Sequence, residues 1–247
     1  KNISKIIQAF MKQKWLLLVF LIFGLAWLTF LRLGDISYVV KISNEDGLVE
    51  YATALFFLIG FIVGVYSIYL RKRLSTPIFI AVIWTTLCFL FLGEETSWFQ
   101  RIFNYSISTV EAVSHQGEFN LHNLSVFNEG GFIADGKINK MSLTERLISS
   151  QNIFRMGFFG YFLIIPILWF ISSNKIKSSL SKMGYIKPSN AVLAIMLIVF
   201  VFSFALVLIS PIEFKSPIAE SREMLYALFI MIYMIVYIKP NEQMVAK

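Results

Sequence analysis

The sequence reads PIFIAVIWTTLCFLFL from Pro77 to Leu92 and continues directly into Gly93-Glu94-Glu95. The apolar run is long enough for a membrane helix, and a proline at its start is typical of the first turn of a helix. Two adjacent carboxylates therefore stand where the predicted helix leaves the lipid. This junction indicates both a membrane fold and a place to look for a functional site.

The composition of the whole chain agrees with a membrane protein. Of its 247 residues, 57% are hydrophobic and only 15% are charged, which is too apolar for an ordinary soluble domain. Its 25 phenylalanines fit lipid-facing helices better than a soluble core. The one cysteine, Cys88, excludes an intramolecular disulfide and a thiolate metal cluster within one chain, and we interpret it as a packing residue.

The pattern of apolar runs predicts an all-α fold. We expect a polytopic membrane helix bundle of about six transmembrane helices, with the N and C termini in the cytoplasm. The predicted spans are 15–31, 48–70, 77–93, 156–173, 191–210 and 218–238. The chain 1–247 then forms a single membrane domain, in which residues 102–155 are an extracytoplasmic loop that carries short interfacial helices.

The basic residues gather on one side of the predicted helices. The segments 1–14, 71–76, 174–189 and 239–247 hold 13 of the 22 basic residues and a single acid, Glu242. The positive-inside rule places these segments in the cytoplasm, so the opposite side receives 9 basic residues and 14 acids. The net charge of +7 therefore follows from topology and does not support nucleic-acid binding.

The first candidate site is the polar stretch that follows the third span. If the helix continues past Gly93, Glu94, Trp98 and Arg101 share one face at positions i, i+4 and i+7. Glu94 and Glu95 are then candidate catalytic carboxylates, and Arg101 is a candidate contact for an anionic substrate group. The alternative is an interfacial Glu/Arg pair that fixes the depth of the helix, with Trp98 in the aromatic belt.

The second candidate site lies in the long loop. His115, Glu118 and His122 stand at i, i+3 and i+7, so a helix here would align two imidazoles and a carboxylate that suit zinc or another divalent ion. Glu94, Glu95 or Glu223, from other helices, are candidates to complete the metal shell, because they lie at the same predicted side of the membrane. The alternative is a loop in which the histidines form ordinary hydrogen bonds.

Three polar stretches resemble motifs of a family of uncharacterised bacterial multi-pass membrane proteins. They are Glu45-Asp46-Gly47-Leu48-Val49-Glu50, Gly93-Glu94-Glu95-Thr96-Ser97-Trp98-Phe99-Gln100-Arg101 and Gln116-Gly117-Glu118-Phe119-Asn120-Leu121-His122-Asn123. The resemblance implies a multi-pass membrane fold and no particular activity. The paired glutamates are also similar to the Glu-Glu-x-x-x-Arg pattern of CAAX-protease-like membrane peptidases. Here, however, Arg101 lies two residues too far along, and no histidine follows His122.

These patterns lead to one main functional hypothesis. We expect a membrane-embedded enzyme of the bacterial cytoplasmic (inner) membrane, with an extracytoplasmic-facing Glu/His site, with or without a divalent metal, that acts on a lipid or lipid-linked substrate. Its partners are then the lipid bilayer and that substrate, and it can form an oligomer or part of a membrane complex. The alternatives are a structural or assembly subunit and a cation or proton transport component. The middle of every predicted span is uncharged, which counts against a conducting path.

Overall fold

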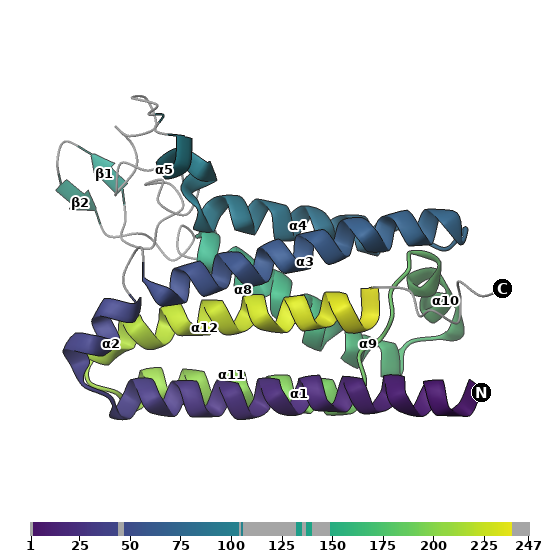
Figure 1. Ribbon diagram of the computed structural model, residues 1–247, viewed down its shortest axis with the longest axis horizontal. Helices are drawn as coiled ribbons and strands as arrows, with labels where there is room; N and C mark the ends of the chain where they lie inside the picture. The colour runs from purple at the N-terminus through teal and green to yellow at the C-terminus, as the bar shows by residue number, and fades with distance from the viewer. Residues whose placement is uncertain are drawn as a thin grey trace. The chain divides into compact units, whose positions relative to one another are not determined.

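The chain folds into long α-helices, as the computed structural model in Figure 1 shows. The model describes residues 2–43, 47–103, 105, 132–134, 137–139 and 149–238. These residues belong to two compact units. The first unit comprises residues 1–89 and 175–247, and the second comprises residues 90–174.

The first unit is a helix bundle. Its elements are α1 (Asn2–Leu33), α2 (Ile36–Ser43), α3 (Leu48–Arg73), most of α4 (Phe79–Glu95), most of α10 (Asn174–Lys182), α11 (Asn190–Ile209), α12 (Ile212–Tyr233) and the π-helical turn η4 (Met234–Ile238). The second unit holds the end of α4, the 3-10 turn η1 (Ser97–Phe99), α5 (Gln100–Phe103), α8 (Ser150–Phe159), the π-helical turn η3 (Gly160–Ile164) and α9 (Ile165–Ile171). It also holds a small antiparallel pair, β1 (Phe132–Ala134) and β2 (Lys137–Asn139).

Five helical segments are long and apolar enough to cross a membrane within the described part of the chain. They are Trp15–Leu33, Ile36–Arg73, Asn152–Ile171, Asn190–Ile209 and Ile212–Ile238. The remaining expected span, 77–93, corresponds to α4, which is apolar but has only 17 residues. That length lies at the lower limit for a bilayer crossing. The expected all-α helical bundle is confirmed. The expected count of about six crossings is the five candidate spans together with α4.

Helix α12 forms the centre of the bundle, because it packs against α1, α2, α3 and α11. Most of its residues from Pro217 onward are buried. Aromatic rings fill the space between the helices: Phe20 of α1 lies 5.5 Å from Phe229, and Phe200 of α11 stacks on Tyr226 at 4.4 Å between ring centroids. Aromatic and aliphatic side chains thus surround α12.

Two glycines let α3 approach its neighbours closely. Gly60 and Gly64 stand one turn apart on a buried face of α3. A Cβ added at Gly60 would lie 3.0 Å from Cys88 Sγ of α4, and one added at Gly64 would overlap Thr85 Oγ1 and lie 2.7 Å from Met234 Cε. Small residues at such spacing allow helices to pack at short range in membranes. Cys88 is buried in this contact, as expected for a packing residue.

Arg71, in the last turn of α3, joins the ends of three helical segments. Its Nε donates to the carbonyl of Ile238 at 2.9 Å, and its Nη1 donates to the carbonyl of Pro77 at 2.9 Å. The side chain is buried, so these bonds compensate the removal of its charged donors from water. Arg71 therefore fixes the end of η4 and the connection into α4.

The helix boundaries differ from the sequence-based expectation mainly in α12. This helix begins at Ile212, six residues before the expected start at Ile218, and continues through Pro217. Proline in a helix interior removes one backbone hydrogen bond, which makes it an unreliable sign of a helix end inside a packed bundle. Glu220 and Glu223 consequently lie well inside the helix.

In the second unit, α8 begins at Ser150, six residues before the expected start of the fourth span at Met156. Ser149 caps it, because its hydroxyl accepts a hydrogen bond from the Asn152 backbone. The π-helical turn η3 follows and leads into α9, where Pro166 lacks the N–H that a regular helix would use. Most of the expected loop 102–155, including its interfacial helices, lies outside the described residues.

Candidate active site

The candidate site lies in the second unit, where α4 ends at Glu95. The hydroxyl of Thr96 donates to the Leu92 carbonyl at 2.8 Å, and the Thr96 backbone N–H donates to the same carbonyl at 3.1 Å. Thr96 therefore occupies the end of the helix and satisfies a carbonyl that would otherwise lack a partner. The helix extends only two residues past Gly93, so the face that would align Glu94, Trp98 and Arg101 is not formed.

A strained turn takes the place of that helical face. Ser97, Trp98 and Phe99 have φ angles of 48°, 52° and 64°, in the left-handed region. A left-handed residue other than glycine costs about 1–2 kcal/mol relative to right-handed backbone. Three in succession require compensating contacts, and strain of this kind gathers at functional sites.

Trp98 makes several of those contacts. Its indole Nε1 donates to Glu94 Oε1 at 2.8 Å, and its ring packs on Gly93, where an added Cβ would lie 2.9 Å from Cδ2. The hydroxyl of Tyr105 donates to the Trp98 carbonyl at 2.9 Å. Because an indole N–H can only donate, Trp98 holds the Glu94 carboxylate in one orientation.

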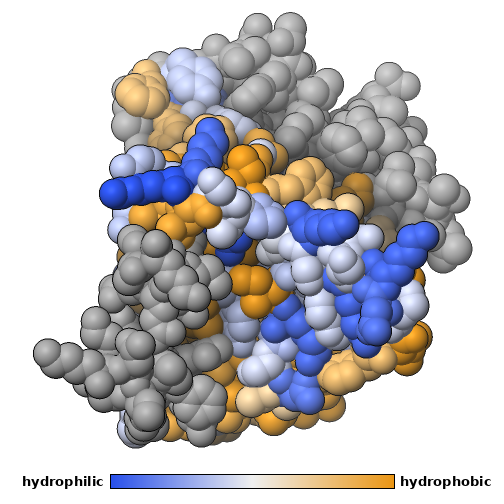
Figure 2. All heavy atoms as spheres, turned by 90° about the vertical axis from the view of Figure 1, so that its right-hand side faces the viewer, coloured by the Kyte–Doolittle hydropathy of each residue, from blue (hydrophilic) through white to orange (hydrophobic). Residues whose placement is uncertain are grey.

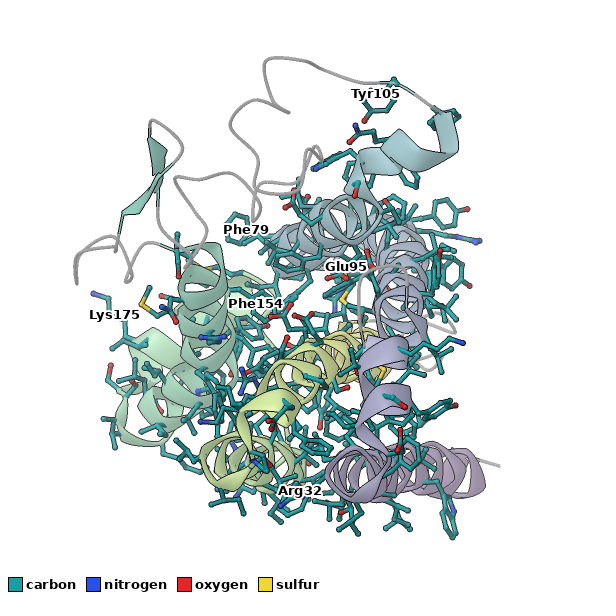
Figure 3. The ribbon with its side chains drawn as sticks, turned by 90° about the vertical axis from the view of Figure 1, so that its left-hand side faces the viewer. Arg32, Phe79, Glu95, Tyr105, Phe154 and Lys175 are labelled. Carbon is teal, nitrogen blue, oxygen red and sulfur yellow. The ribbon has the colours of Figure 1, made fainter. Side chains whose placement is uncertain are left out.

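The structure thus brings together two residues that the sequence singled out, Glu94 and Trp98, by a route different from the expected one. Glu95 follows Glu94 in the sequence, is the last residue of α4 and is half-buried. Arg101 lies in α5, and its side chain is outside the described residues. Figure 3 labels Glu95 at the end of α4 and Tyr105 beyond α5.

The second unit contributes a cation that the sequence reasoning did not consider. Phe91 of α4 and Phe154 of α8 meet edge to face at 5.0 Å between centroids, so α8 packs against the end of α4 (Figure 3). Arg155 follows Phe154, and its Nη1 donates to Asn152 Oδ1 at 3.1 Å. The only signal in the sequence was the position of Arg155 at the edge of an apolar run, where a charged residue is common.

The expected metal ligands cannot be placed as a set. His115, Glu118 and His122 lie outside the described residues. Glu223 is half-buried in α12, which belongs to the first unit. Within the described ranges, no group of three histidine, cysteine, aspartate or glutamate side chains has the geometry to hold a metal ion.

One further charged residue in the first unit was missed. Arg222 is 4% exposed, inside the candidate span Ile212–Ile238, and its guanidinium carbon lies 4.3 Å from the centroid of the Phe204 ring. A cation over an aromatic face is stabilised by the quadrupole of the ring. Arg222 would stand near the start of the predicted span 218–238, whereas it lies well inside α12, which begins at Ile212.

Comparisons with known proteins give no relative from which a role could be transferred. No family model matches the chain, and neither characterised proteins nor solved structures show a significant similarity to it.

Proposed function

We propose that the protein is a membrane-embedded enzyme that acts on a lipid or lipid-linked substrate, with Glu94 and Glu95 as its catalytic carboxylates. In this proposal it resides in the bacterial cytoplasmic membrane, its termini are cytoplasmic, and its site opens to the extracytoplasmic face. The observation that supports it is the Glu94 carboxylate, held by the Trp98 indole on a strained turn at a helix end.

The geometry suits general base catalysis. Trp98 donates to Glu94 Oε1 and so orients the carboxylate that accepts a proton in this proposal. A carboxylate held in this way does not have to reorganise during the reaction, which is the advantage of a preorganised site. The strained backbone of residues 97–99 maintains this orientation through the ring of Trp98.

An anionic substrate also requires a cation. Arg155 on α8 belongs to the same unit as Glu94, and Arg101 on α5 follows the strained turn directly. A guanidinium group binds phosphate or carboxylate in a bidentate manner. We assign this role to Arg155 or Arg101, and the phosphate-containing headgroup of a lipid is the matching substrate group.

The test is lipid turnover by the purified protein in total bacterial lipid extract, followed by mass spectrometry. Wild type should convert one lipid class, and Glu94→Gln should reduce the rate by a factor of about 10² to 10⁴, as expected for a lost general base. The matched control is Glu213→Gln, because Glu213 is an exposed glutamate in the first turn of α12. Equal turnover by wild type and Glu94→Gln would contradict the assignment, and no turnover by wild type would favour a structural or assembly subunit.

A divalent metal such as zinc remains part of the proposal through His115, Glu118, His122 and Glu223. These residue types are suitable ligands for such an ion. Elemental analysis of wild type beside His122→Ala tests it independently of turnover. A stoichiometric metal that the variant loses would support coordination, and a metal-free wild type would remove the metal from the proposal.

A second candidate, cation or proton transport, is favoured by the position of the charged residues in α12. Glu220, Arg222 and Glu223 lie inside a candidate membrane span, where charged groups often mark ion or proton pathways. Proton flux into proteoliposomes that is lost in Glu223→Gln and retained in Glu94→Gln would favour transport over catalysis.

A further inference from the structure

Helix α10, Asn174–Lys182, lies between two candidate membrane spans and is strongly basic. The connection from Asn174 to Ser189 contains four lysines and no acid. None of the residues of α10 is buried against the rest of the protein. An ordered helix that the protein itself leaves uncovered needs a different partner for its apolar side chains.

The apolar side chains of α10 form one stripe. Ile176 and Leu180 stand at i and i+4, and Met183, directly after the helix, continues this spacing at i+7; Ile176 and Met183 remain 50% and 46% exposed. At about 100° per residue, Lys177 lies on one side of this stripe and Lys175 on the other. Lys182 joins Lys175 on its side, and Ser178 and Ser181 lie on the opposite face.

The fold holds α10 in a fixed place at one end of the first unit. After the helix, the carbonyl of Met183 accepts a hydrogen bond from the Ile80 backbone at 3.1 Å, and Gly184 packs on Pro77. Gly184 has a φ of +87°, and a Cβ there would lie 3.0 Å from the Pro77 carbonyl, so only glycine fits this turn. The turn therefore anchors α10 beside the connection between α3 and α4.

The same connection adds further positive charge. Lys72 and Arg73, in the last turn of α3, are exposed. Figure 2 views the end of the molecule that carries α10 in Figure 1, and hydrophilic side chains are gathered there beside hydrophobic ones. This end combines exposed cations with an exposed apolar stripe.

We propose that α10 lies in the membrane interface and binds anionic phospholipid headgroups. Its stripe enters the boundary of the acyl chains, while the lysines on both sides extend to the phosphates. A nucleic acid would use the lysines and leave the stripe in water. An acidic leaflet satisfies both features at once, so charge and apolarity together select the lipid.

The experiment compares lipid retention in nanodiscs made from equal parts of phosphatidylcholine and phosphatidylglycerol. Native mass spectrometry of the released protein counts the retained lipids of each class. Wild type should retain phosphatidylglycerol preferentially, and the double variant Lys175→Gln/Lys182→Gln should reduce this preference by about thirtyfold, as expected for two lysines at an anionic surface. Double replacement by arginine should preserve it.

The matched control is Lys41→Gln/Lys215→Gln, which removes two lysines from α2 and the start of α12. This variant should keep the preference of the wild type. An equal loss in the control, or an unchanged preference in the α10 variant, would overturn the proposal. None of these four lysines belongs to the proposed catalytic site, so failure here is separate from failure of the enzyme hypothesis.

A second measurement tests the depth of the helix directly. A nitroxide attached at Ile176→Cys should be shielded from a water-soluble relaxation agent in nanodiscs and accessible to oxygen, while the buried thiol of Cys88 stays unlabelled. If the Ile176 label in nanodiscs were as exposed to the water-soluble agent as a label on a loop in water, α10 would lie in water. That result would also overturn the proposal.

Discussion

Gly64 of α3 and Gly93 of α4 both make room for a neighbouring group, but the groups differ in kind. At Gly64 the neighbours are Thr85 and Met234, on packed helical segments of the first unit. At Gly93 the neighbour is the ring of Trp98, which belongs to a strained turn and carries a polar bond to Glu94. The first glycine allows helices to approach, and the second allows a carboxylate to be oriented.

The difference teaches where this protein tolerates strain. The helices around Gly64 keep ordinary backbone geometry and gain stability from close apolar contact. The turn after Gly93 has three successive left-handed residues, and its Trp98 holds the Glu94 carboxylate in place. We therefore expect substitutions at the two glycines to separate folding from function.

The largest effect on stability is expected for Gly64→Leu. Its Cβ alone would overlap Thr85 Oγ1, which is itself bonded to the Ala81 carbonyl at 2.6 Å and cannot turn away without losing that bond. Overpacking costs about 1–3 kcal/mol and occasionally more, so we expect a large drop in thermal midpoint or loss of folded protein in detergent. Size-exclusion profiles and thermal melts measure it.

The control for this effect is Gly157→Ala in α8. No atom lies within 4 Å of a Cβ added there, so the gain in helix propensity should leave stability unchanged or raise it by about 0.4–1 kcal/mol. If Gly64→Leu and Gly157→Ala melted alike, close packing at α3 would not explain the need for glycine.

A smaller effect on stability is expected for Gly93→Ala. A Cβ there would lie 2.9 Å from the indole of Trp98, but a side-chain ring can shift where a packed helix cannot. We expect a loss of about 1 kcal/mol in stability together with a change in Trp98 fluorescence. Subtracting the spectrum of the same protein carrying Trp98→Phe isolates the signal of that ring among the five tryptophans. An unchanged spectrum would mean that Gly93 does not position the indole.

The smallest effect on stability is expected for replacement of Asp35, which lies in the corner between α1 and α2. Its carboxylate accepts hydrogen bonds from the hydroxyl of Ser37 and from the Tyr38 and Ser37 backbone, which together hold the pKa of Asp35 below its ordinary value. A lowered pKa in the folded state adds stability above the pKa of the unfolded chain. This stability should decline as the pH falls through the folded pKa.

Thermal melts of wild type and Asp35→Asn between neutral and acidic pH test this sign. The wild type should lose slightly more stability than the variant as the pH falls below the ordinary range of aspartate. Because Asp35 is fully exposed, the difference should be small. A larger loss in the variant would reverse the sign and contradict the capping role.

The sequence was sufficient to predict the helical fold, because apolar runs of membrane length leave few alternatives. It missed the first six residues of α12, which continues through Pro217, and the turn at Ser97 to Phe99, where no glycine signals left-handed backbone. The pairing of Glu94 with Trp98 was expected from helical spacing and arises instead from that turn. Contacts between distant segments, such as Phe91 with Phe154, have no local sequence signal.

The hydrogen bond from Arg71 to the carbonyl of Ile238 joins residues 167 positions apart in the chain. During synthesis, α3 is therefore made long before the carbonyl that its arginine requires. Helix α12, the main neighbour of α3, is likewise made after α3. The face of α3 that contacts α12, and the Arg71 Nε donor, therefore gain these partners only once α12 and η4 have been made. A ribosome stalled before Ile238 should accordingly hold a chain that insertion factors still protect.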